Sequence, residues 1–257
     1  MNVQNLLNFL QTVAPVHMKY DWDNVGLLCG DKNKEISKIL VALDPFMDVC
    51  QEAAELGADV IVTHHPLIFE PLRQVTAQDP VGQCVLFLAQ HGICAVNAHT
   101  NLDCAPGGVN DTLAAVLGLS DVEIIEPRGE NYGLLRKGTV PKQSLPQFMA
   151  QVKKQLGTPI LRYANGKRPV ETVAVGGGSC GDEYEAALAA GCDTLVTADV
   201  KYNQFWNASE LGLNIIDAGH FYTENPVCAV LTQKLRENFP ALTVICSENH
   251  RDCMGFF

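Results

Sequence analysis

The chain lacks several features that would assign it to a common functional class. No apolar run reaches the roughly 18 residues needed to span a bilayer. No cluster of Lys and Arg is visible, and the formal net charge is −11. Since nucleic acids and anionic membranes require a clustered basic surface, we expect neither as a partner. Hydrophobic residues make up 47% of the 257 positions, which is enough for one large or two small globular domains.

The sequence also lacks the patterns of a disulfide-rich or secreted protein. Its ten cysteines form no C-x-x-C pair and lie inside apolar runs such as VLFLAQHGICAV, and the N-terminal residues show no secretory signal. Free cysteine is among the most frequently buried residue types, and thiols stay reduced in the cytosol. We therefore expect reduced, buried thiols and a cytoplasmic location.

Two passages of the chain resemble each other and indicate an internal repeat. EAAELGADVIVTHH (52–65) and YEAALAAGCDTLVTADV (184–200) share a helix, a glycine, an aspartate and an apolar strand. In each half a strand precedes this passage, and a second helix and a third strand follow it. Strands alternating with helices are typical of the α/β class with parallel strands. We predict two α/β lobes from an internal duplication, residues 1–125 and 126–257, with mostly parallel mixed sheets and a C-terminal helix that could pack on the first lobe. Residues 121–169 between the repeats are expected to add a strand pair and a helix.

The stretch VTHHPLIF (62–69) places two adjacent histidines at the end of a predicted buried strand. Parallel α/β sheets bind ligands at the carboxyl ends of their strands, so His64 and His65 are candidate ligands. Neighbouring side chains on a strand point to opposite faces. Either the chain bends at these residues, or two ions are bound.

The third strand of each half also ends in an imidazole and a carboxylate, in NAHTNLD (97–103) and DAGHFYTE (217–224). The strand ends together supply nitrogen and oxygen donors and no thiolate. This mixture suits zinc, iron or manganese better than calcium, and carboxylates can bridge a pair of ions. The candidate ligands are His64, His65, Asp103, His220 and Glu224. His99 could be a sixth ligand, a partner that orients Asp103, or a proton carrier. Thr223 is expected to cap the helix NPVCAVLTQKL and so orient Glu224. Any one such histidine would more often be an ordinary surface residue, so the argument rests on the combination.

Three other segments are alternative functional sites. The glycine turn, residues 176–181 (GGGSCG), satisfies both G-x-S-x-G around Ser179 and G-x-G-x-x-G, with Asp199 as the acid that a dinucleotide site would need. A simple turn from a strand into a helix explains the same residues and is favoured over both motifs. The turn could still bind a substrate phosphate through its backbone N–H groups, as an accessory to the metal site. The acids around Trp22 in DWDNVGLL (21–28) favour a turn with a packed indole over a substrate pocket. KYN (201–203) follows another predicted strand end. It could face a cleft at the strand ends, or be a solvated helix start.

In order along nearly the whole chain, DNVGLL, VTHHPLIF, AHTNLD, GGVND, GGGSCGD and DAGHFYTE resemble the GTP cyclohydrolase 1 type 2 homologues, also called Nif-three-like proteins. The resemblance implies two interlocked α/β repeats, a two-metal centre between them and a homohexameric ring. Carried over by motif, the ligands of the family fall on the same five residues: His64, His65, Asp103, His220 and Glu224. The domain that some relatives insert in mid-chain has no room here, so functions tied to it do not transfer.

Two hypotheses on function follow. The first is a metal-dependent hydrolase in which two ions activate a water against a nucleotide-like or phosphate-containing small molecule. The second is a metal-binding or metal-delivery protein, or an oligomeric scaffold, whose ions are cargo or structural. An open coordination position in a cleft would favour the first hypothesis, and a closed shell the second.

Overall fold

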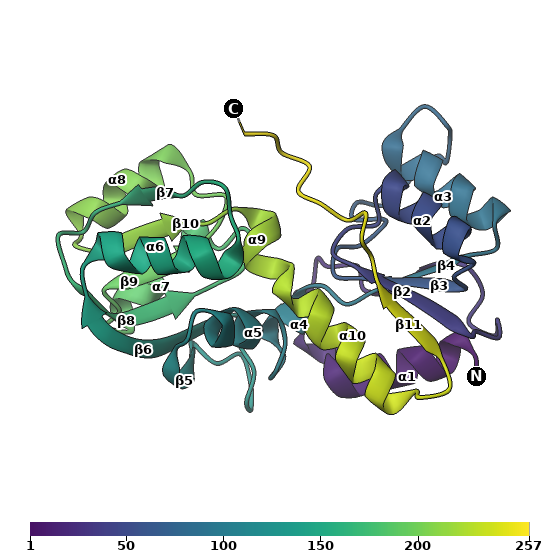
Figure 1. Cartoon of the computed structure of the whole chain (residues 1–257), viewed down its shortest axis with the longest axis horizontal. Coiled ribbons are helices and arrows are strands. Elements are labelled where there is room, and N and C mark those ends of the chain that lie inside the picture. The colour runs from purple at the N-terminus through teal and green to yellow at the C-terminus, as the bar shows by residue number, and fades with distance from the viewer. Residues whose placement is uncertain (257) are drawn as a thin grey trace. The chain divides into compact units, whose positions relative to one another are not determined.

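The computed structural model describes residues 1–256, which form two compact units. Unit 1 comprises Met1–Leu102 and Cys228–Arg251, and unit 2 comprises Asp103–Val227 and the residues from Asp252 onward. Each unit is built from two separate segments of the chain, and each contains one β-sheet covered by helices (Figure 1). The predicted α/β class is confirmed.

The sheet of unit 1 has five strands in the order β1-β4-β3-β2-β11. Their bounds are β1 (Gly26–Cys29), β2 (Lys38–Ala42), β3 (Val60–Thr63), β4 (Cys94–Asn97) and β11 (Thr243–Cys246). β1 is antiparallel to β4, and the other pairs are parallel. The register aligns Ala42 with Thr63 and Thr63 with Asn97, so these three strands end at the same level.

Helices cover both faces of this sheet. α2 (Met47–Leu56) and α3 (Pro80–Gln90) lie on one face, whereas α1 (Val3–Val13) and α10 (Pro226–Asn238) lie on the other (Figure 1). Alternate strand residues, including Leu40, Ile61 and Ala95, pack against buried residues of α2 and α3 such as Val49 and Leu88. The period of two along each strand therefore divides the apolar side chains between two helical layers. A short 3-10 helix (Val16–Met18) follows α1, and α4 (Thr100–Cys104) follows β4.

The sheet of unit 2 has six strands in the order β5-β6-β8-β9-β10-β7. Their bounds are β5 (Ser120–Ile125), β6 (Leu135–Gln143), β7 (Arg162–Ala164), β8 (Val170–Val175), β9 (Thr194–Thr197) and β10 (Asn214–Asp217). β8, β9 and β10 are parallel to one another, whereas β5, β6 and β7 pair in antiparallel fashion. β5, β6 and α6 (Leu145–Leu156) are the strand pair and helix expected between the repeats.

Unit 2 also has helices on both faces of its sheet. Val175, Val196 and Ile216 share a core with α5 (Val109–Val116) and α6 (Leu145–Leu156), and Phe148 of α6 is fully buried there. The opposite face packs against α7 (Tyr184–Ala189) and α8 (Tyr202–Glu210). A 3-10 helix (Gly181–Glu183) precedes α7, and α9 (His220–Glu224) follows β10.

The two sequence passages that resemble each other occupy equivalent places in the two sheets. Each unit contains a strand-helix-strand-helix-strand motif with parallel strands. The motif is β2-α2-β3-α3-β4 in unit 1 and β8-α7-β9-α8-β10 in unit 2. All ten cysteines lie within the described residues as free thiols, and seven of them are buried. The expectation of burial is wrong for Cys29 and Cys246, which are half-buried, and for Cys253, which is exposed near the C-terminus. Every helix among the described residues is too short or too polar to span a lipid bilayer.

Candidate metal centre

The two adjacent histidines of VTHHPLIF lie just beyond the end of β3, where the chain bends. β3 ends at Thr63, whose hydroxyl donates to the backbone oxygen of His65 at 2.7 Å. This bend places both rings on one side, with 4.9 Å between their centroids. The sequence leaves open a bend of the chain or two bound ions at these residues, and the structure shows the bend.

His99 joins these two residues in a histidine cluster that belongs entirely to unit 1. Its ring centroid lies 5.2 Å from that of His64 and 5.6 Å from that of His65. Each of the three residues offers one ligand atom, and these atoms lie within 4.8 Å of one another. The cluster could therefore hold a metal ion through three imidazole nitrogens.

Each imidazole of the histidine cluster is oriented by an oxygen acceptor at Nδ1. Nδ1 of His64 lies 3.0 Å from the backbone oxygen of Ala98, and that of His65 lies 2.6 Å from Asp44 Oδ1. Nδ1 of His99 lies 2.8 Å from Asp23 Oδ1. Oxygen acceptors at Nδ1 favour the tautomer that carries its proton there and turns Nε2 toward the cluster. Metal-binding histidines almost always have such a partner.

Asp23 fixes His99 from a buried position. Its carboxylate also accepts hydrogen bonds from the backbone N–H and the hydroxyl of Thr100. Burial raises the pKa of Asp23, but the hydrogen bonds from His99 and Thr100 outweigh it and lower this pKa to about 2. Asp23 therefore stays ionised and accepts the Nδ1 proton of His99.

In unit 2, α9 places His220 and Glu224 one turn apart on the same helix face. Nε2 of His220 lies 3.0 Å from Oε2 of Glu224. The expectation that Thr223 caps the next helix is wrong, because Gly219 at φ 86° begins a separate short helix at His220. Thr223 lies inside this helix, where its hydroxyl oxygen is 3.1 Å from the backbone oxygen of Gly219. The orientation of Glu224 is thus set by α9 itself.

His220 lies between two carboxylates. Its Nδ1 is 2.7 Å from Asp199 Oδ2, and its Nε2 faces Glu224. Burial lowers the pKa of His220, but hydrogen bonds and charge from Asp199 and Glu224 outweigh it and raise this pKa to about 11. The site therefore favours a positive charge, which either a proton or a metal ion could supply.

The glycine turn lies directly against this pair of residues. A Cβ atom on Gly178, whose φ is +63°, would overlap Oε1 of Glu224 and would lie 3.2 Å from Nε2 of His220. Only glycine leaves room for Glu224 here and tolerates this backbone conformation without strain. The turn is therefore part of the site formed by His220, Glu224 and Asp199, which we call the acid–histidine site.

The alternative roles of the glycine turn do not fit its hydrogen bonds. The N–H of Gly177 donates to Asn110 Oδ1 at 2.7 Å, and that of Gly178 donates to the Thr223 hydroxyl at 3.0 Å, so neither is available to a phosphate. The hydroxyl of Ser179 donates its single proton to Asp199 at 2.6 Å rather than to a histidine base. Asp199 in turn holds Nδ1 of His220, so the presence of an acid at this position is explained without a bound dinucleotide.

Asp103 lies in α4 and belongs to the same unit as His220 and Glu224. Asp103 and Glu224 each offer a carboxylate oxygen within 4.8 Å of the other, and both are buried. The amide of Asn110 donates to the backbone oxygen of Asp103 at 3.2 Å and links it to the glycine turn. The structure thus brings together the three unit 2 residues that the sequence predicts: Asp103, His220 and Glu224.

The donor chemistry fits a divalent metal held by nitrogen and oxygen. Burial and the nearby Asp103 carboxylate raise the pKa of the Cys104 thiol to about 11, and burial also raises the pKa of Cys180 well above its usual value. Both thiols stay protonated and are poor metal ligands. Imidazole and carboxylate groups remain, the set that zinc, iron and manganese accept.

Three acids that orient the histidines were not predicted as such: Asp23, Asp44 and Asp199. Asp44 follows the end of β2, which is the direct neighbour of β3 in the sheet. The rule that assigns His64 and His65 to a strand end would also have found Asp44, had it been applied to β2. Asp199 is held two residues beyond β9 at φ 51°, a conformation that the sequence does not indicate.

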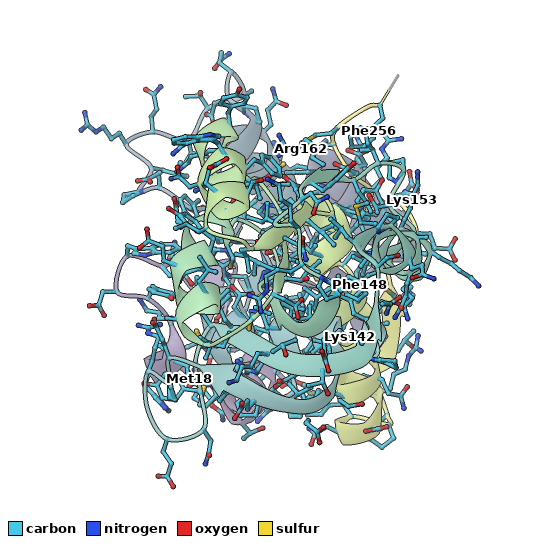
Figure 2. The ribbon with its side chains drawn as sticks, turned by 90° about the vertical axis from the view of Figure 1, so that its left-hand side faces the viewer. Met18, Lys142, Phe148, Lys153, Arg162 and Phe256 are labelled. Atoms are coloured by element: carbon cyan, nitrogen blue, oxygen red, sulfur yellow. The ribbon has the colours of Figure 1, made fainter. Side chains whose placement is uncertain are left out.

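A cavity of about 360 Å³ adjoins the acid–histidine site within unit 2. Its lining includes Asp199 and Gly219, which flank His220, together with Arg162 and Phe256. Both of the latter side chains are labelled in the upper part of Figure 2. The volume is within the range of small-molecule pockets in proteins.

Comparison with known proteins places these residues in a family. Residues 1–253 match the family described as Duf34/NIF3 (NGG1p interacting factor 3). A "GTP cyclohydrolase 1 type 2 homolog" of Clostridium perfringens is 35% identical over 261 residues, covering 100% of both chains. The structure of a hypothetical protein of Staphylococcus aureus aligns at a TM-score of 0.94 and 28% identity, covering 100% of this chain and 99% of that one. A Bacillus cereus protein related to NIF3 gives a TM-score of 0.95 at 25% identity, with the same coverage. The chain therefore belongs to the Duf34/NIF3 family.

Proposed function

We propose that the chain binds two divalent metal ions, zinc, iron or manganese, through one combined set of ligands: His64, His65, Asp103, His220 and Glu224. The observation that carries the proposal is that every histidine of this set has an oxygen acceptor at Nδ1. Ordinary surface histidines seldom come in such a uniformly oriented group, whereas metal ligands do.

Chain connectivity supports a combination of the two sets of residues. His99 of the histidine cluster and Asp103 of unit 2 are only four residues apart. Four residues span at most about 14 Å even when fully extended. The carboxylates of unit 2 would supply the negative charge that balances the ions, and the imidazoles of unit 1 would supply neutral donors.

We further propose that the protein is a metal-dependent hydrolase acting on a nucleotide-like or phosphate-containing small molecule. The names of relatives such as the Clostridium perfringens protein make GTP the first candidate substrate. A pair of bound divalent ions would lower the pKa of a coordinated water and polarise the group that is attacked.

The residues of the chain would bind the substrate and move protons. His99 is held by Asp23 with Nε2 toward the ligand cluster, which suits it to accept a proton from the attacking water. The cavity beside Asp199 gives a small substrate room next to His220. Assembly into a homohexameric ring and a cytoplasmic location remain predictions from the family resemblance and from cysteine usage.

The test is metal content per chain, measured by elemental analysis of wild type, His65→Ala and Glu224→Ala. We expect about two ions in the wild type and a loss in both variants. The matched control is His91→Ala, because His91 is exposed and its Nδ1 bonds only within its own helix turn, to the backbone oxygen of Phe87. Absence of metal after reconstitution of the wild type would overturn the proposal.

Turnover is measured on the same samples with GTP. Hydrolysis by the metal-loaded wild type, lost in Glu224→Ala, supports the hydrolase. Stable metal binding without turnover of GTP or of simple phosphate esters would instead support the second hypothesis, a metal-binding or scaffold protein.

A further inference from the structure

Two large aromatic side chains stand exposed beside the histidine cluster. Trp22 is 60% exposed and Phe69 is 51% exposed, although they are in contact, with ring centroids 5.7 Å apart. Both residues belong to unit 1 but lie 47 positions apart in the chain, so folding brings them together. Adjacent exposed aromatic rings expose apolar area to water, and such patches usually have a binding role.

This aromatic pair adjoins His99. The ring centroid of His99 lies 6.2 Å from that of Trp22 and 6.1 Å from that of Phe69, both in edge-on geometry. A ligand lying on the pair would therefore reach the histidine cluster without any change in the fold. The rings of Trp22 and Phe69 are therefore placed where they could bind a ligand next to the histidine cluster.

Hydrogen bonds hold the loops that carry the two rings. The amide of Asn24 donates to the backbone oxygen of Ile68 at 2.7 Å and ties the two loops together. The ammonium of Lys19 donates to the backbone oxygen of Asp23 at 2.8 Å, and Asp23 is itself fixed by Thr100. Trp22 and Phe69 are therefore presented on a preorganised frame, which lowers the entropy lost when a ligand binds.

The geometry favours a flat ring over a cation as the ligand. An aromatic cage for a cation needs space between its rings. Here the rings contact one another. The centroids of Trp22 and Phe69 are 5.7 Å apart, and Tyr20 stacks on Trp22 with centroids 5.8 Å apart and planes 20° apart. The planes of Trp22 and Phe69 are 59° apart, so one further planar ring that stacks on either of them would meet the other edge to face.

We propose that Trp22 and Phe69 form a stacking platform for the flat heteroaromatic ring of a small-molecule ligand at the edge of the histidine cluster. The inference deepens the proposed function, since it assigns the ring-bearing part of the substrate to named residues. It also accounts for the tryptophan in DWDNVGLL, which the metal ligands leave unexplained.

Tryptophan fluorescence tests the platform directly, because the chain has two tryptophans, Trp22 and Trp206. Trp206→Phe leaves Trp22 as the sole reporter, and Trp22→Leu leaves Trp206, which is 65% exposed on α8 and serves as the matched control. Each variant is titrated with guanosine 5′-monophosphate and with ribose 5-phosphate, which lacks the base. We expect saturable quenching of Trp22 by the nucleotide alone and only collisional, linear quenching of Trp206.

A second pair of variants assigns the effect to the platform. In the Trp206→Phe background, Phe69→Ala should raise the Kd for the nucleotide about 5-fold or more, as expected for loss of one stacking partner. Tyr163→Ala is the control, because Tyr163 is 54% exposed in β7 of unit 2, outside the platform. It should leave the Kd unchanged.

Three results would overturn the inference. The first is equal, linear quenching of Trp22 and Trp206 by the nucleotide. The second is an equal response of Trp22 to the nucleotide and to ribose 5-phosphate. The third is a Trp22 emission that shifts with protein concentration, which would mean that a second copy of the chain covers the rings. Titrations with metal-free and metal-loaded protein separate this inference from the proposed function. Saturable quenching by a protein that binds no metal would keep the platform and defeat the metal centre, whereas a metal-loaded protein without saturable quenching would do the reverse.

Discussion

The histidine cluster of unit 1 and the acid–histidine site of unit 2 differ in how they are charged. In unit 1 three imidazoles face one another, and the carboxylates Asp23 and Asp44 lie behind the rings. In unit 2 one imidazole, His220, lies between Glu224 and Asp199, and its pKa is raised to about 11. Unit 1 is therefore organised to orient nitrogen donors, and unit 2 to attract positive charge.

This difference indicates what each site would contribute to the proposed metal centre. Oriented imidazoles determine geometry and favour zinc, iron or manganese, but they add no charge. Carboxylates add charge and can bridge two ions. A metal centre needs both properties, so changes confined to one unit should have distinguishable effects.

The largest effect is expected for Gly178→Ala, which would disrupt the acid–histidine site alone. The new Cβ would overlap Oε1 of Glu224, so Glu224 must move and metal binding should be lost. Gly191→Ala is the matched control, since Gly191 has φ +80° with nothing near its Cβ position. A left-handed alanine costs both variants about 1–2 kcal/mol, but only Gly178→Ala should lose metal by elemental analysis. Equal metal content in the two variants would contradict this role of the glycine turn.

The second-largest effect is expected in the pH dependence of stability, because His220 in unit 2 carries a positive charge. The pKa of His220 is raised from 6.5 to about 11, so its contribution to the stability of the metal-free protein is complete below pH 6.5 and is lost as the pH rises through 11. Its side chain is 31% exposed, so solvent screening reduces the effect, and we expect a loss of about 3 kcal/mol. Urea unfolding of metal-free protein at several pH values measures it.

His220→Gln supplies the control for this pH dependence, because glutamine has no titrating group in this range. Its unfolding free energy should vary less than that of the wild type between pH 6.5 and 11. Identical pH profiles for the two proteins would show that His220 does not carry the charge. Bound metal should flatten the wild-type profile, since the ion takes the place of the proton.

A smaller effect is expected in unit 1, for Asp23→Asn. The pKa of Asp23 is lowered from 3.8 to about 2, so its stabilising contribution is present above pH 3.8 and is lost as the pH falls toward 2. The difference corresponds to about 2 kcal/mol. Urea unfolding should show the wild type more stable than the variant at pH 7 and the two nearly equal near pH 2. Asp21→Asn, a change at the exposed neighbouring acid, should alter stability at pH 7 by less than about 0.5 kcal/mol.

The elements of the fold and the candidate ligand residues follow from local patterns, whereas the residues that orient them, apart from Asp44, do not. Buried runs such as VIVT and TLVT predict parallel strands, and strand ends predict His64 and His220. The pairing of β11 with β2 is not predicted, because it joins residues about 200 positions apart without a local signal. The start of α9 depends on the backbone of Gly219, and the orientation of each imidazole depends on the order of strands in the sheet. Both are properties of the assembled fold.

The smallest effect is expected for Asp44→Asn, which tests whether the acids behind the imidazoles of unit 1 matter for metal binding. Asp44 holds Nδ1 of His65 at 2.6 Å, and an asparagine would keep the shape but lose the charge. Changes at residues that orient a metal-binding histidine cost at least about tenfold in metal affinity, which is about 1.4 kcal/mol. Competition with a chromophoric chelator measures this change, with Asp31→Asn in an exposed turn as the control. Because the amide oxygen of the introduced asparagine could still accept the Nδ1 proton of His65, an unchanged affinity would mean that orientation alone, and not charge, is what unit 1 supplies.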